Sequence, residues 1–480
     1  YLIMPITING SGTVTGISAG GLPDGTVDAD TLAANAVTDA KIAANAVTDA
    51  KIASNAVTNA KIADDAVAAA EIADNAVGLA ALAGIARGKI IIGDANGDPA
   101  VVSAGSADQV LTSDGTDVAW ADAGGAGIGE NIIHNPEFRI WQRGTSVTGV
   151  GTDSYSADRF KLWSNGGSHA LTVSRETEVP TTGTFQYSAK LDVTTSDTGN
   201  GAVAFVQRLE KQDVYHIFRG NSASQATHFT FWAKSNKTGT YVFNLTAYMA
   251  TARSFVKEFT MTSSWQKFTI AIPADTATNS WNGNPWDTGA QIGINLQTKN
   301  TGGGANQDYA MATNNQWQNQ SLGGNDYAIG TSNQTDFFDS TSNDLWTTGW
   351  KWEVGTAETA FVSRPLGVEM PMAQRYFEPI VNKENSEGIC VLSYWGTGAA
   401  YGSVRFNTIK RTTPSMQFSQ GSHFKVKHAG GDRQCSQMGS AGTCSTHMRP
   451  DFNASGGTNG ECGWGCTTSA DAYWWMRSEM

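Results

Sequence analysis

Residues 35–63 read NAVTDAKIAANAVTDAKIASNAVTNAKIA, nearly the same ten residues three times over. In the wider repeat, from residue 31 to residue 82, a large apolar residue recurs every five positions. On an α-helix a step of five residues turns the side chain by about 140°, so these residues would scatter around every face. A coiled-coil seam is excluded as well, because it needs apolar residues every three and four positions. The period of five is therefore neither that of a helix nor that of a strand.

Two features of the repeat favour different local structures. Its many Ala residues favour a helix, whereas its Ile and Val residues are β-branched and suit an extended chain better. A strict short period is typical of units that bury their apolar faces only by stacking or intertwining. A stretch this short would give a solenoid few coils, so the sequence favours three copies of the chain wound together. The residues expected at the axis of this homotrimer are Ile42, Val47, Ile52, Val57, Ile62 and Val67.

The composition of the whole chain points to β structure. Of 480 residues only 16% are charged, while 53 are Gly and 15 are Trp, which is typical of strands and turns rather than helical bundles. No stretch has the clustered Lys and Arg of a nucleic-acid-binding protein. No apolar run approaches the roughly eighteen residues of a membrane helix. The sequence therefore predicts no nucleic-acid partner and no membrane insertion.

Turn and strand signals divide the chain into five expected segments. Residues 1–30 read as an extended attachment segment and residues 31–82 as the repeat shaft. Residues 83–125 read as a collar of two β-hairpins, because Asn-Gly and Asp-Gly pairs at 96–97 and 114–115 favour tight hairpin turns. Residues 126–368 alternate apolar and polar positions between Gly, Asn and Ser turns, as in a two-sheet jelly-roll sandwich. Residues 369–480 read as a C-terminal β domain at the tip, so the expected fold class is mainly β.

The five cysteines leave three interpretations open. Cys435, Cys444, Cys462 and Cys466 lie in the last fifty residues, and Cys390 stands apart. Disulfides, a zinc site completed by a nearby His and unpaired thiols remain as alternatives. Because no recognised zinc-ligand spacing is present, the sequence predicts no metal site and no cofactor.

Enzyme signatures are scarce. The chain has no P-loop, no G-x-S-x-G elbow and no H-E-x-x-H motif. Paired carboxylates cleave glycosidic bonds in many glycosidases, but Asp among Gly and Asn more often forms turns with its own backbone. The sequence therefore predicts a protein that is not an enzyme and has no catalytic residues. The Asp residues weighed as a possible pair lie in the polar stretch 300–346 and are Asp308, Asp326, Asp336, Asp339 and Asp344.

Aromatic residues among amides suggest a site for sugars. A sugar ring needs a flat apolar surface for its C–H face and amide or carboxylate groups for its hydroxyls. The alternative is that these aromatics are core residues or trimer contacts, since large aromatics dominate both. The candidate glycan-binding residues are Trp281, Trp286, Tyr309, Trp317, Tyr327, Trp464 and Trp474.

Several stretches of the chain, taken in order, resemble bacteriophage tail fibre proteins. They are MPITINGSGTVTGISAGGLPDGTVDADTLA (4–33), the AVTDAKIA repeats, NIIHNPEFRIWQRGTS (131–146), YSADRFKLW (155–163) and GWKWEVGTAETAFVSRPLGVEMPMAQRYFE (349–378). The resemblance runs from about residue 4 to residue 380, and more loosely through STHMRPDFNASGGTNGECGWG (445–465). It implies a trimeric virion component of the phage tail, made in the host cytoplasm and joined at its N-terminus to a tail or baseplate protein. It also implies a carbohydrate-binding-like jelly roll.

The expected function is recognition of a bacterial surface glycan, either lipopolysaccharide or capsule, for host attachment. Two alternatives stay open. One is a tailspike depolymerase that cleaves surface polysaccharide, and the other is a purely structural fibre spacer.

Overall fold

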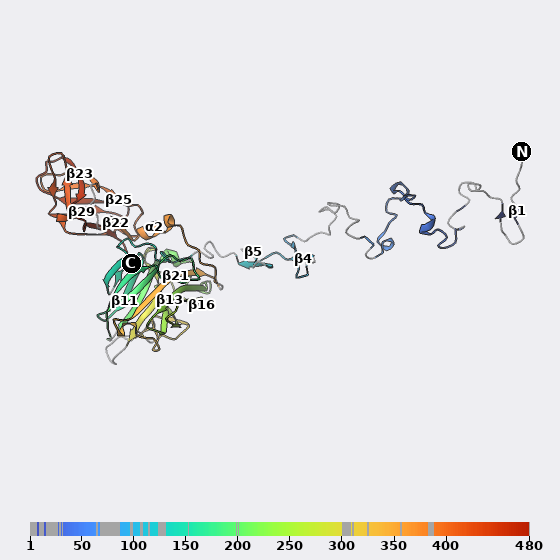
Figure 1. The fold of residues 1–480 in the computed structure, drawn as a ribbon, viewed down its shortest axis with the longest axis horizontal. Helices are drawn as coiled ribbons and strands as arrows, with labels where there is room; N and C mark the ends of the chain where they lie inside the picture. Colours follow the sequence, from blue (N-terminus) through green and yellow to red (C-terminus); the bar gives the residue numbers. More distant parts are fainter. Residues whose placement is uncertain are drawn as a thin grey trace. The chain divides into compact units, whose positions relative to one another are not determined.

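A computed structural model of the chain describes residues 7–8, 14–15, 27, 30, 32–63, 66–67, 87–96, 99–105, 109–113, 116–122, 131–151, 153–197, 199, 201–299, 309, 312–323, 326–355, 358–382 and 388–479. It contains two compact units, Tyr1–Ala104 and Gly105–Met480 (Figure 1). Its sheets are antiparallel throughout and its helices are few, so the mainly β class is confirmed. Among the described residues no helix is long and apolar enough to cross a bilayer.

The repeat makes one tight turn after another, five residues apart. The Ala36 N–H donates to the Ala33 carbonyl at 2.9 Å, and the Lys41 N–H donates to the Thr38 carbonyl at 2.8 Å. Asn35 in the first turn has a φ of 64°, in the left-handed region that Asn tolerates better than most residues. Ile42 and Ile52 are themselves in extended conformation, so extended residues alternate with tight turns. The period of five arises because a turn interrupts the chain at every fifth residue.

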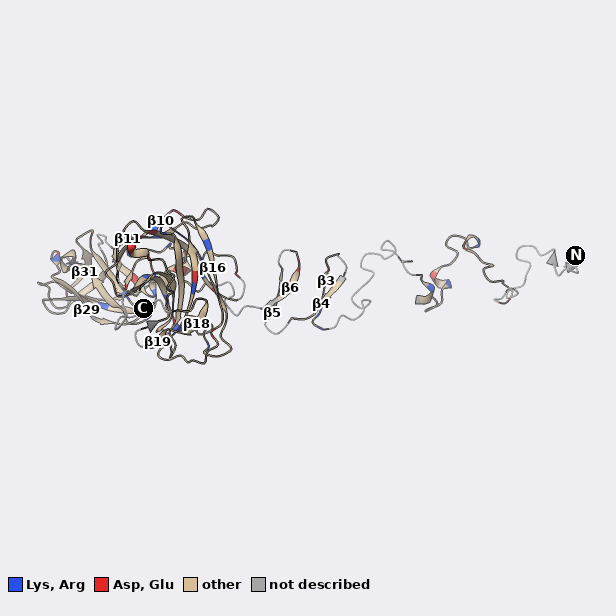
Figure 2. Ribbon diagram, turned by 90° about the horizontal axis from the view of Figure 1, so that it is seen from below, with Lys and Arg blue, Asp and Glu red and all other residues tan. Residues whose placement is uncertain are grey.

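Every second turn of the repeat is a single 3-10 turn that ends on Lys (Figure 2). The Lys41 ammonium donates to the Ala36 carbonyl at 2.7 Å, and Lys51 makes the same bond to Ala46. This bond fastens each 3-10 turn to the Asn turn before it. The bounds of the 3-10 turns are η1 (Asp39–Lys41), η2 (Asp49–Lys51) and η3 (Asn59–Lys61).

The apolar residues that follow the turns are left exposed in the single chain. Their exposed fractions are 43% for Ile42, 54% for Val47, 43% for Ile52, 54% for Val57, 44% for Ile62 and 52% for Val67. The described part of the repeat therefore buries none of the six large residues assigned to the trimer axis.

Both expected hairpins form. In the first unit β3 (Ile90–Gly93) pairs with β4 (Pro99–Val102), and β1 (Thr7–Ile8) pairs with β2 (Val14–Thr15). In the second unit β5 (Gln109–Ser113) pairs with β6 (Val118–Asp122). The Gly of each predicted turn lies outside the described residues.

A two-sheet sandwich follows in the second unit. Its six-stranded sheet has the order β16-β13-β21-β11-β10-β7, and its seven-stranded sheet has the order β18-β15-β14-β17-β12-β9-β8. The strands are β7 (Ser146–Val150), β8 (Ser154–Tyr155), β9 (Phe160–Asn165), β10 (Ala170–Glu176), β11 (Ser188–Thr195), β12 (Gly201–Glu210), β13 (Thr227–Ser235), β14 (Gly239–Ala247), β15 (Arg253–Met261), β16 (Gln266–Ile272), β17 (Thr288–Lys299), β18 (Gln316–Asn319) and β21 (Asp344–Val354). Smaller elements beside them are α1 (Lys211–Val214), β19 (Ser321–Gly323), β20 (Asp326–Tyr327) and η5 (Phe337–Asp339).

Aromatic rings fill the space between the two sheets. Trp350 of β21 is fully buried and meets Phe160, Phe205 and Phe229 edge-on, with ring centroids 5.2–6.0 Å apart. Edge-on pairs of this kind are favourable beyond the area they bury. The core therefore explains why the strands of 131–354 are rich in Phe and Trp.

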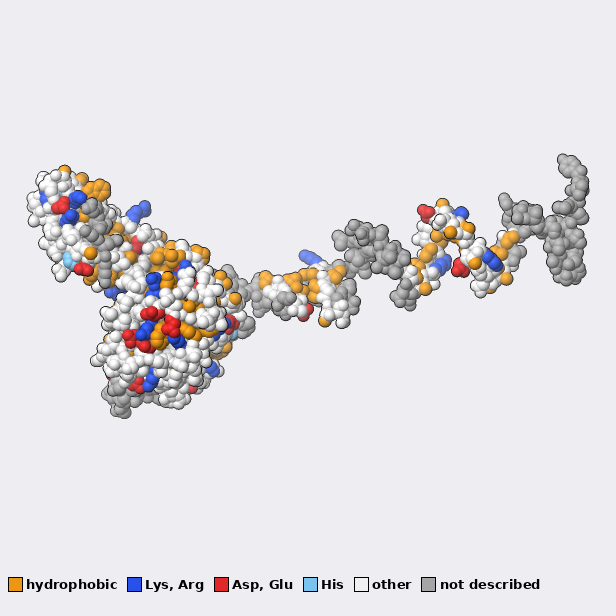
Figure 3. All heavy atoms as spheres, viewed as in Figure 1, with side chains coloured by type: hydrophobic (Ala, Val, Ile, Leu, Met, Phe, Trp, Pro, Cys, Tyr) orange, Lys and Arg blue, Asp and Glu red, His pale blue; other side chains and the backbone are white. Residues whose placement is uncertain are grey.

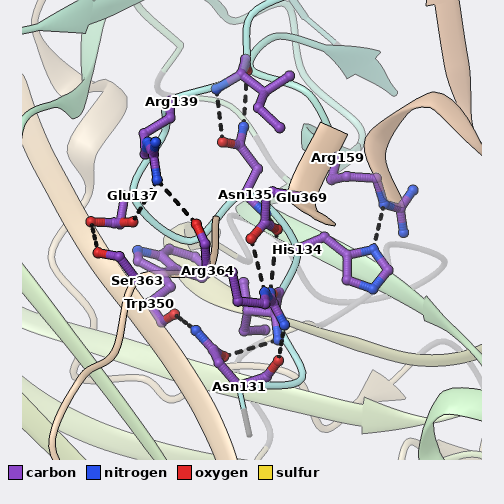
Figure 4. Close-up of polar contacts among 12 residues, drawn as sticks. Asn131, His134, Asn135, Glu137, Arg139, Arg159, Trp350, Ser363, Arg364 and Glu369 are labelled. Carbon is purple, nitrogen blue, oxygen red and sulfur yellow. Dashed lines mark hydrogen bonds and ion pairs between the residues drawn. The ribbon is translucent and has the colours of Figure 1, made fainter. Parts of the chain in front are cut away.

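Residues that precede the first strand of the sandwich and residues that follow its last strand are joined by hydrogen bonds. The Arg364 guanidinium lies between the Glu369 carboxylate, 2.8 Å away, and the Asn131 carbonyl, 2.5 Å away (Figure 4). The Asn131 amide in turn donates to the Trp350 carbonyl at 2.7 Å. Glu369 also accepts from the Asn135 N–H at 2.6 Å. These motif residues therefore act in folding, because they are buried or half-buried among their own partners.

The C-terminal region builds two further sheets on a core of its own. Helix α2 (Leu366–Gln374) leads into a three-stranded sheet of order β22-β32-β26, and a larger sheet has the order β25-β30-β24-β23-β31-β27-β28, with β29 paired to β30. The strands are β22 (Phe377–Asn382), β23 (Cys390–Tyr394), β24 (Ala400–Gly402), β25 (Val404–Arg405), β26 (Ser415–Phe418), β27 (Phe424–Lys427), β28 (Arg433–Gln434), β29 (Gln437–Thr443), β30 (His447–Asn453), β31 (Cys462–Thr467) and β32 (Tyr473–Arg477), with the 3-10 turn η6 (Gly421–His423).

All five cysteines lie in this region, within the described residues, and none of them forms a disulfide. Burial raises the pKa of the Cys390 and Cys435 thiols to about 12, which keeps both thiols protonated at neutral pH. Within the described part of the chain, no three His, Cys, Asp or Glu side chains gather into a group that could hold a metal ion.

Candidate functional site

Two of the predicted glycan-binding tryptophans serve in packing. The Trp281 indole N–H donates to the Phe218 carbonyl at 2.7 Å, and its ring meets Tyr215 edge-on at 5.1 Å. The Trp317 indole N–H donates to the Pro273 carbonyl at 2.6 Å, and its ring packs against Phe218 at 5.6 Å. Both rings are half-buried against the sandwich core, so their edges are already engaged by the protein.

The other predicted residues fall into different environments. Trp474 is fully buried in the C-terminal core and Tyr309 is 3% exposed, so assigning them to a glycan surface is wrong, because neither presents a ring face to a ligand. Trp286 is 42% exposed, and its carbonyl accepts from Arg411 at 2.9 Å. The side chain of Tyr327 lies outside the described residues.

Trp464 is the predicted residue that stands on an open surface with a hollow beside it. It is 55% exposed on β31, and its neighbours Gly463 and Gly465 are buried. Val391 pairs with it from β23, and Lys427 pairs with it from β27. These side chains border a hollow of about 390 Å³. Across these three strands, the Trp464 ring therefore lies between an apolar side chain, Val391, and a cationic side chain, Lys427.

A second hollow lies on the same sheet. Trp395, at the end of β23, is 81% exposed. It borders a hollow of about 330 Å³ with Ser393, Tyr401 and Arg449. The Arg449 guanidinium lies over the Tyr401 ring, 4.8 Å from its centroid. This contact is a cation–π pair, which holds both side chains in place.

The register of the strands joins the two hollows into one face. Ser393 pairs with Cys462 of β31 on one side and with Tyr401 of β24 on the other. From β27 to β30 the sheet takes four strand spacings of about 4.8 Å, or about 19 Å in all. We call this outward side the aromatic face. Its residues are Val391, Ser393, Trp395, Tyr401, Lys427, Arg449, Cys462 and Trp464.

An ion pair between Glu461 and Arg433 supports one edge of the aromatic face. Glu461, which precedes β31, lies 2.9 Å from the His428 ring nitrogen and 3.2 Å from the Arg433 guanidinium. The Thr458 backbone N–H, followed by Arg433, lowers the pKa of the Glu461 carboxyl. The carboxylate is therefore ionised at neutral pH, and it positions His428, which lines the Trp464 hollow.

The chemistry of this face suits a sugar. Exposed indole and phenol rings can stack on the apolar side of a pyranose, and hydroxyl, guanidinium and ammonium groups can bond its hydroxyls. A contiguous exposed apolar patch on a soluble protein is commonly an interaction site. In the view of Figure 3, apolar side chains reach the surface of the C-terminal region beside charged ones.

Sequence reasoning missed Trp395, Tyr401 and Arg449. A signal for Trp395 exists, because it stands at the end of a strand pattern and directly before the turn residues GTG. Tyr401 and Arg449 lie 48 residues apart in the sequence, and only the strand pairing brings them together.

The described Asp residues of the polar stretch are engaged locally. Asp336 accepts from the Phe338 N–H at 2.9 Å, Asp339 pairs with Lys237 at 2.5 Å and Asp344 pairs with Lys190 at 3.0 Å. Asp308 and the Asp326 side chain lie outside the described residues. Of the three described side chains, Asp336 forms the turn that the sequence predicts, and the other two sit in ion pairs.

Comparison with known proteins gives likenesses to solved structures alone. No family model and no curated protein matches the chain. The chain is similar to the enzymatically active domain of bacteriophage CBA120 tailspike protein 4, at 13% identity and a TM-score of 0.23, over 43% of this chain and 21% of that one. It is also similar to a family 11 carbohydrate-binding module of Clostridium thermocellum, at 11% identity and a TM-score of 0.23, over 45% of this chain and 98% of that one. A putative sugar-binding protein of Bacteroides thetaiotaomicron gives 12% identity and a TM-score of 0.24, over 47% and 100%. The chain thus spans about a fifth of the tailspike's length, and likeness at this level says nothing of what the chain binds.

Proposed function

We propose that this chain is a fibre subunit of a bacteriophage tail that binds a bacterial surface glycan through the aromatic face. The observation behind the proposal is the row of exposed rings on one sheet, with Trp395 at 81% and Trp464 at 55% exposure. Ring faces of this kind cost free energy in water, and a sugar polymer lying along the row would cover them. The ligand is lipopolysaccharide or capsule, as the tail fibre resemblance implies.

We further propose that three copies of the chain join along the repeat, and that residues 1–30 attach to a tail or baseplate protein in the virion. The support for the trimer is the exposure of every Ile and Val from Ile42 to Val67 in the single chain. Six large apolar residues at a five-residue spacing would be buried together only if neighbouring chains covered them.

The proposed subunit binds its glycan without cleaving it. The described Asp residues of the polar stretch already have partners. We expect no new reducing ends when the protein is incubated with host capsule or lipopolysaccharide. If the native chain releases reducing ends and Asp336→Asn or Asp339→Asn does not, the result would support the tailspike alternative instead.

Binding of the full chain to an array of bacterial surface glycans tests the proposal. We expect Trp395→Ala to weaken the strongest array signal at least tenfold, with an unchanged far-UV spectrum. Trp286→Ala is a matched control, since Trp286 is also exposed, at 42%, but lies outside the aromatic face. Equal loss in both variants, or no glycan bound by the native chain, would contradict the proposal.

A further inference from the structure

A groove of about 580 Å³ lies between the sandwich and the three-stranded sheet. One wall is the whole of β7 with Asp153 and β8, and the floor is Gln417, Trp475 and Arg477. β7 is the last strand of its sheet. The volume falls within the range of small-ligand sites, about 300–1,000 Å³. No residue that lines this groove also belongs to the aromatic face.

The floor of the groove is a fixed aromatic surface. On β32 the side chains of Trp474 and Met476 point into the core, so Tyr473, Trp475 and Arg477 point outward. The Trp475 ring is stacked on Tyr473, with centroids 4.5 Å apart, and Phe377 meets it edge-on at 5.6 Å. Two neighbouring rings therefore hold the indole in one orientation before any ligand arrives.

The polar groups of the groove are held as firmly. The Arg143 guanidinium lies 3.7 Å from the centre of the Phe377 ring and pairs with Glu479 at 2.6 Å. Arg477 donates to the Gln417 side-chain oxygen at 3.2 Å. Burial raises the pKa of the Tyr155 phenol to about 12, so its hydroxyl stays protonated at neutral pH. Pre-positioned donors cost little entropy when a ligand binds.

Each charged side chain that lines the groove has an oppositely charged partner. Arg143 lies near Asp158 at 3.7 Å as well as Glu479, Asp153 pairs with Lys161 at 2.8 Å, and Arg477 lies 3.9 Å from Glu479. The charges of Arg159 and Arg208 also act on Tyr155, which lines the groove. Because the charged side chains of the groove are already paired, we expect the groove to bind a ligand by stacking and hydrogen bonds rather than by charge attraction.

We propose that this groove is a second glycan site that takes an uncharged saccharide segment. A sugar ring would stack on Trp475, while the Gln417 amide, the Arg477 guanidinium and the hydroxyls of β7 would bond its hydroxyl groups. The aromatic face and the groove could then hold different parts of one polymer. The proposal for the groove stands or falls separately from that for the aromatic face.

The test blocks the groove from the side of β7. Thr148 is exposed and lines it, so Thr148→Tyr places an uncharged ring in the space without touching the core, and Tyr suits a strand. Thr195→Tyr is the matched control, because Thr195 is an exposed strand residue of the same sheet outside the groove. Gln417→Ala removes one polar partner and leaves the space open. The probes are hexamers of neutral glucose, galactose and mannose and of anionic galacturonate, titrated calorimetrically into the full chain.

We expect at least one neutral hexamer to bind the native chain and Thr195→Tyr equally, and Thr148→Tyr at least tenfold more weakly. Gln417→Ala should weaken the same binding several-fold. Three results would overturn the proposal: no neutral hexamer bound, equal binding by Thr148→Tyr, or a preference for the galacturonate hexamer that Thr148→Tyr abolishes. Loss of binding in Trp395→Ala with none in Thr148→Tyr would assign the neutral sugar to the aromatic face.

Discussion

Exposure divides the tryptophans of the C-terminal region into two kinds with opposite expected effects. Trp474 is fully buried against Phe452, whereas Trp395 is 81% exposed. Removing a buried aromatic side chain costs about 3–5 kcal/mol, while exposed substitutions usually change stability by less than about 0.5 kcal/mol. We therefore expect Trp474→Ala to lower the thermal midpoint of this region clearly, and Trp395→Ala to leave it unchanged. Equal midpoints for the two variants, measured by circular dichroism, would show that the burial is not as described.

His134 gives the sandwich a dependence on pH. Burial, followed by Arg159, Arg364 and Arg375, holds the pKa of this imidazole well below its ordinary value of 6.5. Below about pH 6.5 the His134 imidazole therefore binds a proton in the unfolded chain but stays neutral in the folded chain. Stability is fully present above pH 6.5 and is lost as the pH falls, by at most about 1.4 kcal/mol per pH unit.

The measurement compares thermal midpoints at pH 7.5 and pH 5.0 for the native chain and for His134→Gln. Gln offers an oxygen that can accept the Arg159 bond, which the ring nitrogen accepts at 3.4 Å. We expect the midpoint of the variant to fall less than that of the native chain. The comparison with the variant is needed because Asp158 and Asp213 act in the opposite sense. Burial raises the pKa of both carboxyls to about 6, so their destabilising effect fades as the pH falls. Identical slopes for the two proteins would rule His134 out.

At the scale of elements, much of the fold could be predicted, because the signals that mark strands and hairpins lie within short stretches of sequence. The alternation of apolar and polar residues marks strands such as β10 and β16, and Asn-Gly and Asp-Gly pairs mark the hairpins β3–β4 and β5–β6. The turns of the repeat were not predicted, because the conformational preferences of Ile and Val alone indicate an extended chain. What decides the turns is Asn35 and its equivalents at positive φ.

The candidate site was less accessible to sequence reasoning. Alternation places Trp474 and Trp475 on opposite sides of β32, yet nothing in the sequence says which side is the core. The partner of the Trp281 indole is a carbonyl 63 residues away. Rings become ligand surfaces or core according to such distant contacts, and composition cannot foresee them.

The repeat shaft yields a prediction about assembly. Ile52 is 43% exposed in the single chain. The proposed trimer would bury the three copies of this side chain together at one axis. Ile52→Asp would then bring three carboxylates together away from water, which is strongly unfavourable. We expect sedimentation equilibrium to find the native chain a trimer and this variant a monomer or a weak trimer.

Ser54→Asp is the control, since it adds the same charge two residues away at an exposed polar position. It should remain trimeric. A native chain that sediments as a stable monomer would show that the exposed Ile and Val serve some other contact.

At the scale of the whole molecule, the proposed trimer and the proposed glycan site would together overcome one problem, which is the weakness of a single shallow sugar site. A millimolar dissociation constant is worth only about −4 kcal/mol, too little to hold a virion on a cell. Several linked sites act at effective concentrations in the millimolar range, which can raise overall binding by roughly 10²–10⁴ without any new contact. A trimer that presents three aromatic faces would therefore bind a cell surface far more tightly than one face binds a sugar.

The prediction that follows separates affinity from avidity in the same full-length chain. Ile52→Asp leaves the aromatic face untouched, since the two lie in different units, so calorimetry with a short glycan should give the native dissociation constant per site. Binding to whole cells should nevertheless fall by about 10²–10⁴, because a monomer engages one site at a time. Trp395→Ala should do the reverse: it should keep the trimer and lose affinity per site, and its loss on cells should be larger still, since each of three contacts is weakened. If the Ile52→Asp monomer held cells as well as the native trimer, one chain would suffice for attachment, and the repeat would need another explanation.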